Sequence, residues 1–423
     1  MAAERQNLNP KRSLAVIAGV LSLCTAAYSA PKYKVLLAFD GADGYGPSDG
    51  VTLDQKGNVY GAAGNGGSGN CRNGCGLIFQ LTRNAKGKWT ETVLYSFQGG
   101  GDGAAPVGRP VAGASGDLYG TTTGAGAHGA GTAFELTPGT DGWAETTLYS
   151  FCPKIGKSGC KDGGGTETGL TQDTVGNLYG TKPGGGGYLG AVFELVPESG
   201  GWSEVILYVF GTHRDDGAGP YAALILDPTG NLYGTTIGGG NQCGSSSCGT
   251  VYELTPGSGG KWKETVLHRF DNNGKDGITP GAGALFMDTS GNLYGTTESG
   301  GCCGGVVYQF TPKPGGGWKE AILHNFKPGR GGSFPGSGVV MDKSGNLYGT
   351  TVDGGGPNSC GVIYKLAPAG KENWKYSVLH RFGRVHDGCI PAGNLAVDPK
   401  GNLYGGTVLG GDHGYGIVFE LTP

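Results

Sequence analysis

Aspartate followed by glycine recurs along this sequence, and carboxylates at regular intervals are its first candidate for binding chemistry. Carboxylates arranged around a common opening could bind cations or sugar hydroxyls. In the alternative interpretation each aspartate caps its own backbone turn and the glycine supplies a positive φ. The sequence favours the turn, since no Asp-x-Asp-x-Asp spacing accompanies the pairs. We therefore expect no catalytic residue, metal or cofactor, with calcium as the alternative. The candidate ligand-binding residues are Asp102, Asp162, Asp216, Asp276 and Asp387.

Ten cysteines follow residue 30, and an even number in an exported chain favours disulfide bonds. The simplest pairs are local: Cys71 with Cys75, Cys152 with Cys160, and Cys243 with Cys248. Cys360 with Cys389 would join neighbouring repeats and leave Cys302 and Cys303 as a vicinal pair. Sequence leaves the connectivity open. A metal site at Cys71 and Cys75 is the alternative, but no histidine stands at zinc-finger spacing from them.

Histidines and aromatic residues in loops are the remaining candidates. His128, His213, His386 and His413 fall in loops without a Ser or Cys nucleophile motif, so we expect surface residues. The other three replace tyrosines of a repeated strand, and we expect them to be structural: His268, His324 and His380. The aromatic residues that could face a ligand are Tyr45, Tyr188, Phe334 and Tyr415.

The first 30 residues differ from the rest. Basic residues precede an apolar run, Leu14 to Leu21, and small residues end at Ala30. This layout predicts a secretory signal peptide over residues 1–30, and hence a secreted, periplasmic or cell-surface protein. No second apolar stretch follows, so we expect no membrane span in the mature chain. The formal net charge of −3, without basic runs, argues against nucleic-acid binding.

The elements that position these residues come from a sevenfold repeat. The stretch Gly230-Asn231-Leu232-Tyr233-Gly234-Thr235-Thr236 has seven versions, spaced 54 to 61 residues apart. Each period contains four short runs rich in Val, Thr and aromatic residues and bounded by Gly, Pro, Asn and Asp. In the fourth repeat the expected strands are 221–226, 231–236, 249–255 and 262–270. We therefore predict an all-β, seven-bladed β-propeller of four-stranded blades over residues 31–423, a single monomeric domain.

Strand order also predicts how the ring closes. The first repeated segment, residues 33–39, has the pattern of a fourth strand, whereas the last one, residues 416–422, has that of a third. Seven copies of every strand exist only if the N-terminal strand completes the last blade. We therefore expect these two segments to pair, which protects edges that would otherwise pair between molecules. An open β-solenoid is the alternative fold.

Four linked motifs carry a resemblance to a known family. They are Gly291 to Thr297, Gly249 to Pro256, Val93 to Phe97 and Asp102 to Pro106. Across residues 33–423 the chain resembles the GloVer-type tandem repeat proteins, also called choice-of-anchor tandem repeat proteins. The resemblance implies an exported bacterial repeat protein and no established activity.

Strand alternation sorts the connections onto two faces. The cysteines and Asp-Gly pairs share the face that holds the loops between strands two and three and the links between blades, here called the loop face. We expect a binding or interaction module whose extracellular or envelope ligand, a glycan or a protein, contacts this face. The alternatives are a secreted lyase or hydrolase acting on a carbohydrate or lactone, and a structural component of the cell envelope.

Overall fold

The computed structural model describes residues 30–47, 49–156, 159–160, 164–184, 189–213, 215–240, 248–281, 283–370, 373–383 and 385–423. The predicted signal peptide, except for Ala30, and Asp162, Cys243 and Tyr188 lie outside the described residues. Contacts divide the chain into Met1–Ala30 and Pro31–Pro423. In the described part of the chain, no helix has the length and apolar character needed to cross a lipid bilayer.

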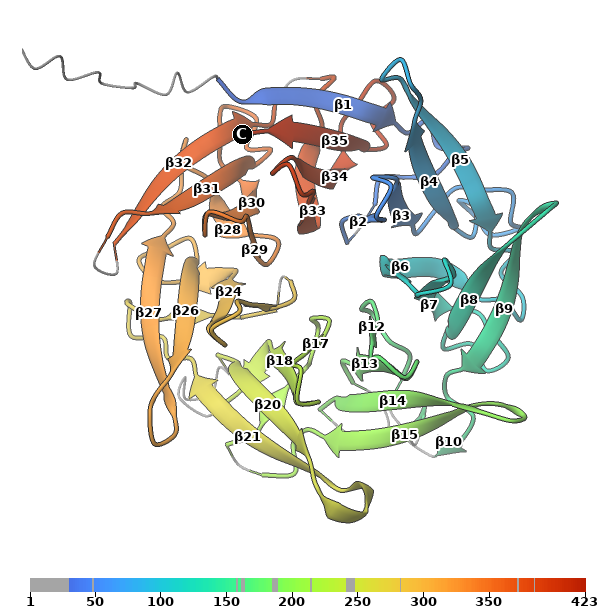
Figure 1. Cartoon of the computed structure of the whole chain (residues 1–423), viewed down its shortest axis with the longest axis horizontal. Coiled ribbons are helices and arrows are strands. Elements are labelled where there is room, and N and C mark those ends of the chain that lie inside the picture. Colours follow the sequence, from blue (N-terminus) through green and yellow to red (C-terminus); the bar gives the residue numbers. More distant parts are fainter. Residues whose placement is uncertain are drawn as a thin grey trace, which may run out of the picture. The chain divides into compact units, whose positions relative to one another are not determined.

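Residues Pro31–Pro423 form a ring of seven antiparallel sheets around a common axis, which confirms the predicted propeller (Figure 1). The centre of the ring is here called the channel. Blade 1 contains β2 (Thr52–Leu53), β3 (Val59–Ala63), β4 (Leu77–Arg83) and β5 (Trp89–Ser96). Blade 2 contains β6 (Ala104–Ala112), β7 (Leu118–Gly124), β8 (Thr132–Gly139) and β9 (Gly142–Ser150). Blade 3 contains β12 (Thr171–Gln172), β13 (Leu178–Lys182), β14 (Ala191–Glu198) and β15 (Gly201–Val209).

The remaining blades repeat this order. Blade 4 contains β17 (Ile225–Leu226), β18 (Leu232–Thr236), β20 (Thr250–Pro256) and β21 (Trp262–Arg269). Blade 5 contains β23 (Phe286–Met287), β24 (Leu293–Thr297), β26 (Val306–Pro312) and β27 (Trp318–Asn325). Blade 6 contains β28 (Ser333–Pro335), β29 (Val340–Met341), β30 (Leu347–Asp353), β31 (Val362–Pro368) and β32 (Trp374–Arg381). Blade 7 contains β33 (Cys389–Val397), β34 (Leu403–Leu409), β35 (Ile417–Thr422) and β1 (Lys32–Ala38).

Short elements decorate the loops. One is a single 3-10 turn, η1 (Ser258–Gly260), in blade 4. The others form two-stranded pairs: β10 (Ile155–Gly156) with β11 (Gly159–Cys160), β16 (Gly217–Ala218) with β19 (Gly238–Gly239), and β22 (Gly277–Ile278) with β25 (Ser299–Gly300).

The ring closes through β1, as predicted. This strand pairs antiparallel with β35, and the register places Tyr33 opposite Leu421 and Ala38 opposite Ile417. Tyr33 also stacks on His380 of blade 6 with ring centroids 3.8 Å apart, and its hydroxyl donates to the Asp387 carbonyl at 2.7 Å. The N-terminal strand therefore completes blade 7 and also contacts the preceding blade.

The repeated Gly-Asn-Leu-Tyr-Gly motif stabilises each blade in three ways. In blade 4, Asp227 Oδ1 accepts from the Asn231 backbone N–H at 2.9 Å and fixes the turn before β18. Tyr233 donates to Asp227 at 3.2 Å, and its ring lies edge-on to Trp318 of blade 5. A Cβ on the glycine after the tyrosine, Gly234, would lie 2.4 Å from the Tyr252 hydroxyl, so this position accommodates the aromatic ring of the next strand.

The innermost strands are shorter than predicted in all blades except 2 and 7, where β6 and β33 have nine residues each. We expected residues 221–226 to be one strand, whereas β17 contains only Ile225–Leu226. The preceding residues face the channel, where backbones of different blades approach closely. A Cβ on Gly108 would lie 2.3 Å from the Gly169 Cα, and one on Gly338 would lie 2.2 Å from the Ala284 carbonyl oxygen. Inner segments therefore pack backbone against backbone and leave the regular ladder.

Candidate functional site

The predicted Asp-Gly aspartates lie at the interfaces between blades. Each described one accepts a hydrogen bond from the Tyr or His near the end of the preceding fourth strand. Asp276 is bonded to His268 at 3.0 Å, and Asp387 to His380 at 3.1 Å. The same contact joins Asp102 to Tyr95 at 3.0 Å and Asp216 to Tyr208 at 3.1 Å.

These aspartates also cap their own links, as the turn interpretation requires. Asp216 accepts from the backbone N–H of Gly211 at 2.9 Å and of Gly217 at 2.8 Å. None of the four described aspartates lines the small channel cavity described below. Their geometry makes them connectors between blades, and a ligand-binding role for the set stays a prediction.

Sequence reasoning missed the third partner in these clusters. In five of the six outer strands that carry a tryptophan, the residue two positions after it is a glutamate, which faces the preceding blade. Burial and the neighbouring Asp216 raise the pKa of Glu264 to about 7. Burial, together with Asp43, raises the pKa of Glu91 to about 8. The glutamate that recurs two positions after five of the six tryptophans was the signal that could have shown these acids.

Disulfide bonds stabilise the loop face, and their presence was predicted. They join Cys71 to Cys75, Cys152 to Cys160, and Cys360 to Cys389. Cys248 is also disulfide-bonded, and its predicted partner lies outside the described residues. Cys302 and Cys303, which were disulfide candidates, are instead free and exposed thiols. Adjacent cysteines bridge only with strain, and here the Cys302 thiol lies 3.4 Å from the Phe326 carbonyl oxygen.

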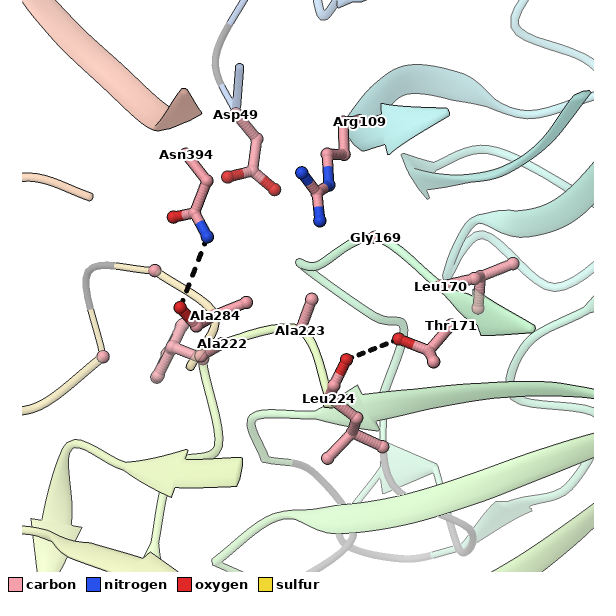
Figure 2. Close-up of a pocket in the computed structure, with 13 residues that line it drawn as sticks. Asp49, Arg109, Gly169, Leu170, Thr171, Ala222, Ala223, Leu224, Ala284 and Asn394 are labelled. Atoms are coloured by element: carbon pink, nitrogen blue, oxygen red, sulfur yellow. Dashed lines mark hydrogen bonds between the residues drawn. The ribbon is translucent and has the colours of Figure 1, made fainter. Parts of the chain in front are cut away.

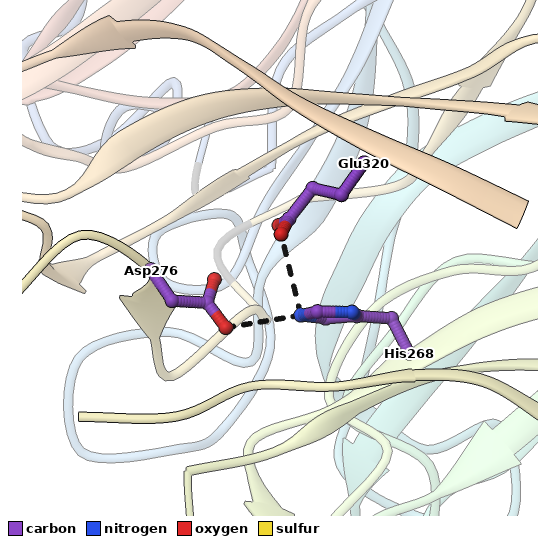
Figure 3. Close-up of side chains that lie close together, drawn as sticks. All are labelled: His268, Asp276 and Glu320. Atoms are coloured by element: carbon purple, nitrogen blue, oxygen red, sulfur yellow. Dashed lines mark hydrogen bonds and ion pairs between the residues drawn. The ribbon is translucent and has the colours of Figure 1, made fainter. Parts of the chain in front are cut away.

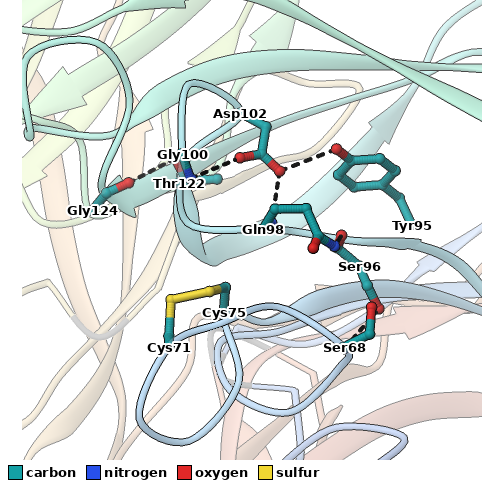
Figure 4. The surroundings of a disulfide bond; sticks show 10 residues. All are labelled: Ser68, Cys71, Cys75, Tyr95, Ser96, Gln98, Gly100, Asp102, Thr122 and Gly124. Atoms are coloured by element: carbon teal, nitrogen blue, oxygen red, sulfur yellow. Dashed lines mark hydrogen bonds between the residues drawn. A yellow bond between two sulfur atoms is a disulfide. The ribbon is translucent and has the colours of Figure 1, made fainter.

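Figure 4 shows how one disulfide supports a link between blades. The Cys71–Cys75 bond lies beside the segment that leads from blade 1 to blade 2. A Cβ on Gly99 would lie 2.7 Å from the Cys71 sulfur, so the link and the disulfide pack closely. Asp102 holds the same link from the other side, since it accepts from the Gln98 N–H at 2.7 Å.

The strongest break in the repeat lies in the central channel. Two consecutive positions of each inner segment carry Gly, Ala, Ser or Thr, with three exceptions: Asp49, Arg109 and Asn394. All three line a cavity of about 60 Å³ between the blades (Figure 2). These residues were not among the sequence candidates, although aligning the inner segments of the repeats reveals them.

Asn394 has a structural role in this cavity. Its side-chain oxygen accepts from the Gly338 N–H at 2.7 Å, and its amide donates to the Ala284 carbonyl at 3.3 Å. One side chain from blade 7 therefore joins the inner segments of blades 5 and 6. Gly50 of blade 1 lies on its other side and forms a parallel bridge with Asn394.

Asp49 and Arg109 form an opposite-charge pair in the channel. Their charged groups face each other across the cavity in Figure 2. Arg109 remains exposed to the lumen although protein surrounds the channel. Burial raises the pKa of Asp49 to about 6, and the Arg109 charge acts in the opposite direction. An aspartate that titrates near neutral pH beside a guanidinium can exchange hydrogen bonds with a polar ligand group.

Comparison with known proteins places this repeat in a family. A family model described as the Gloeobacter/Verrucomicrobia repeat matches residues 19–187, 70–304 and 241–423. The chain belongs to this family. The predicted resemblance is thereby confirmed. No curated protein matches the chain.

One solved structure similar to this member of the Gloeobacter/Verrucomicrobia repeat family is PorZ of Porphyromonas gingivalis. The two share 14% sequence identity with a TM-score of 0.50. The match covers 88% of this chain and 46% of PorZ, so the chain spans about half the length of that protein. At this identity the similarity shows the fold alone.

Two predicted loop aromatics of this family member come together. Tyr45 stacks on Tyr415 with ring centroids 4.5 Å apart, at the junction of blades 7 and 1. Val408 and Leu409, at the end of β34, are exposed nearby in the chain. Phe334 lies apart, in β28, and has a φ of 55°.

The histidines divide as predicted between strands and loops. His324 stacks on Tyr376 of the next blade with centroids 4.0 Å apart, and burial lowers its pKa to about 4. Among the loop histidines, His386 contacts Asp412 at 2.5 Å on the surface. His268 differs from the other strand histidines because two carboxylates face it (Figure 3).

Proposed function

We propose that the protein is an exported binding module that recognises an extracellular or envelope ligand, a glycan or a protein, at the loop-face mouth of its channel. The observation that supports this proposal most directly is that Asp49 and Arg109 interrupt the pattern of small residues in the inner segments. Apart from Asn394, the other inner segments carry small residues at these positions, which permit close packing. A charged pair at two of these positions has no counterpart in the other blades.

The cavity size narrows the ligand chemistry. A volume of about 60 Å³ accommodates a few water molecules or one small functional group. Sites for whole small molecules typically measure about 300–1,000 Å³. The channel therefore receives a protruding carboxylate or hydroxyl of a larger ligand. Arg109 would hold a carboxylate through paired N–H donors, and Asp49 would accept from a hydroxyl.

The loop face supports this proposal because its loops differ between blades and are held rigid. In six of the seven blades the opposite face repeats one turn, in which an aspartate accepts from the backbone N–H four residues on, as Asp227 does from Asn231. The loop face instead varies from blade to blade and is held by disulfides. Rigid loops lose less conformational entropy on binding.

Disulfides also support an extracellular or envelope location, since such bonds persist in oxidising compartments. PorZ is described as a bacterial surface component of the type-IX secretion system. A surface role for the present chain is consistent with that likeness. The predicted signal peptide over residues 1–30 would supply the export route.

An enzymatic alternative has one observation in its favour. Asp49 and Arg109 form the convergent charged pair that acid-base chemistry needs. The cavity beside them is too small for a sugar ring or lactone, which favours binding over turnover. A purely structural envelope component is the remaining alternative, and it requires no ligand at the channel.

The test is a binding screen of the mature protein on glycan and envelope-protein arrays with matched variants. Arg109→Ala and Asp49→Ala introduce residues that blade 4 carries at these positions, Ala223 and Ala222. We expect each to reduce binding at least 10-fold. Lys343→Ala, on the turn face, is the control and should bind like the wild type. Equal binding by all three variants would refute the channel as the site.

A further inference from the structure

The interface between blades 4 and 5 brings three metal-ligating side chains together (Figure 3). Ligand atoms of His268, Asp276 and Glu320 all lie within 4.8 Å of one another. His268 Nε2 is 3.0 Å from Asp276 Oδ2 and 3.6 Å from Glu320 Oε1. Bonds of 2.0–2.2 Å in a tetrahedral zinc site place neighbouring ligand atoms roughly 3.3–3.6 Å apart. The two distances from His268 lie close to that range, and the distance between the two carboxylates is at most 4.8 Å, so side-chain adjustment can seat an ion.

The surrounding structure already orients these ligands. The imidazole of His268 packs edge-on against Phe270, with centroids 4.7 Å apart, and lies 5.0 Å from the Phe310 ring. Asp276 accepts from the Gly277 N–H at 2.7 Å and from the Asp271 N–H at 3.0 Å. Such outer hydrogen bonds fix ligand orientation in metal sites.

The glutamate adds a second observation, which is shared by the equivalent Oε1 atoms of Glu91 and Glu264 but, among the described residues, is combined with a histidine only here. Glu320 Oε1 is buried yet accepts no hydrogen bond. A buried carboxylate oxygen without a donor is costly unless a cation faces it. Burial raises the pKa of Glu320 to about 7, and His268 acts in the opposite direction. A bound divalent ion would supply the missing partner.

The position is also accessible. An open recess of about 480 Å³ is lined by the three cluster residues and, in part, by Asp271, Asn273 and Lys275. An ion held by three side chains at its base keeps one coordination position open to water. Three protein ligands and one open position are the arrangement of catalytic rather than structural zinc sites.

The other interfaces provide internal comparisons. By sequence, only blades 4 and 5 combine His, Asp and Glu. The preceding interface has Tyr208 with Asp216 and Glu264, and the interface of blades 6 and 7 has His380 with Asp387 and Tyr33. A phenol is a poorer ligand than an imidazole at neutral pH. The geometry points to a binding site for a divalent transition-metal ion such as Zn²⁺ at His268, Asp276 and Glu320.

The ligand set also selects the type of ion. One imidazole and two carboxylates suit Zn²⁺ and its neighbours in the first transition series. Ca²⁺ prefers six to eight oxygen ligands, which this cluster does not offer. The site lies away from the channel and is independent of the proposed binding function.

Isothermal titration with Zn²⁺ alone tests the proposal. The background carries Cys302→Ser and Cys303→Ser, which removes the free thiols. We expect one ion per chain, and His268→Tyr or Glu320→Gln to weaken binding about 100-fold or more. His380→Tyr, at an interface without a glutamate, is the matched control and should keep one ion.

A gain-of-site variant keeps the test decisive if a loss variant misfolds. Tyr208→His recreates the His-Asp-Glu set beside Asp216 and Glu264 and should raise the stoichiometry from one ion to two. The proposal is overturned if the parent shows no saturable Zn²⁺ binding. It is equally overturned if folded His268→Tyr and Glu320→Gln proteins bind Zn²⁺ as the parent does.

Discussion

Lys182 stands where five other repeats have threonine, and its side chain is fully buried. Its Nζ lies 2.6 Å from Glu204 Oε1, and the two side chains are 0% and 4% exposed. Two aromatic rings, Phe151 and Phe193, lie 5.2 and 5.6 Å from the ammonium group. We predict that Lys182→Thr, which restores the repeat residue, destabilises the fold.

The magnitude follows from the geometry. At 2.6 Å and an effective dielectric constant of about 20, the Coulomb attraction is about 6 kcal/mol. Desolvation offsets part of this, and breaking a buried pair costs about 3–5 kcal/mol. Lys182→Thr should therefore lower the free energy of unfolding by about 3–5 kcal/mol. The loss arises because Glu204 stays buried without its cation.

Urea unfolding of four proteins checks this value: wild type, Lys182→Thr, Glu204→Gln and the double variant. We expect the double variant to be more stable than the sum of the single effects predicts, by about 2 kcal/mol or more, since it buries no unpaired charge. Thr236→Ser, at the equivalent position of blade 4, controls for local packing. A Lys182→Thr cost below about 1 kcal/mol, or an additive cycle, would refute the reasoning.

Three further outcomes are expected. Deleting residues 30–38 should lower the thermal midpoint by several degrees because β35 loses its partner, and an unchanged midpoint in calorimetry would contradict closure by β1. Replacing Cys360 and Cys389 by serine should cost about 3.5 kcal/mol, against about 2 kcal/mol for Cys71 and Cys75, because their separations are 29 and 4 residues; equal losses in paired urea titrations would argue against loop length as the cause. Burial raises the pKa of Glu91 from 4.5 to about 8, so the folded state binds this proton more tightly and its contribution to stability is lost as pH rises through that range. Glu91→Gln should therefore melt like the wild type at pH 4.5 and at a higher temperature at pH 8.5, and a difference of the same size at both pH values would contradict this assignment.

The fold was predictable because the four-strand pattern of one blade recurs seven times in the sequence. Six of the seven copies pair a turn aspartate with a strand tyrosine, and the offset between the first and last segments also followed from the strand patterns. The exceptions within the repeat were harder to interpret. Asp49 and Arg109 belong to different repeats and come together only when blade 1 packs against blade 2, and one sequence gives no direct measure of that proximity.

The interfaces between blades show the same limit. His268 was recognised as a replacement for tyrosine and predicted to be structural. Its neighbour Glu320 lies more than 50 residues away and looked like ordinary strand surface. Only packing of one blade against the next puts the two 3.6 Å apart. Motifs within single repeats therefore could not show which side chains of neighbouring blades interact.

Closure by β1 also sets an order of events. During synthesis β1 is the first strand to emerge, whereas its partner β35 is the last. The six complete blades can form as their residues appear, whereas the seventh must await a contact across almost the entire chain. Such a non-local step is slow compared with hairpin formation. The protein thus remains an open arc until its last strand is made, with one unpaired edge at each end, and passes to a closed ring in a single late event.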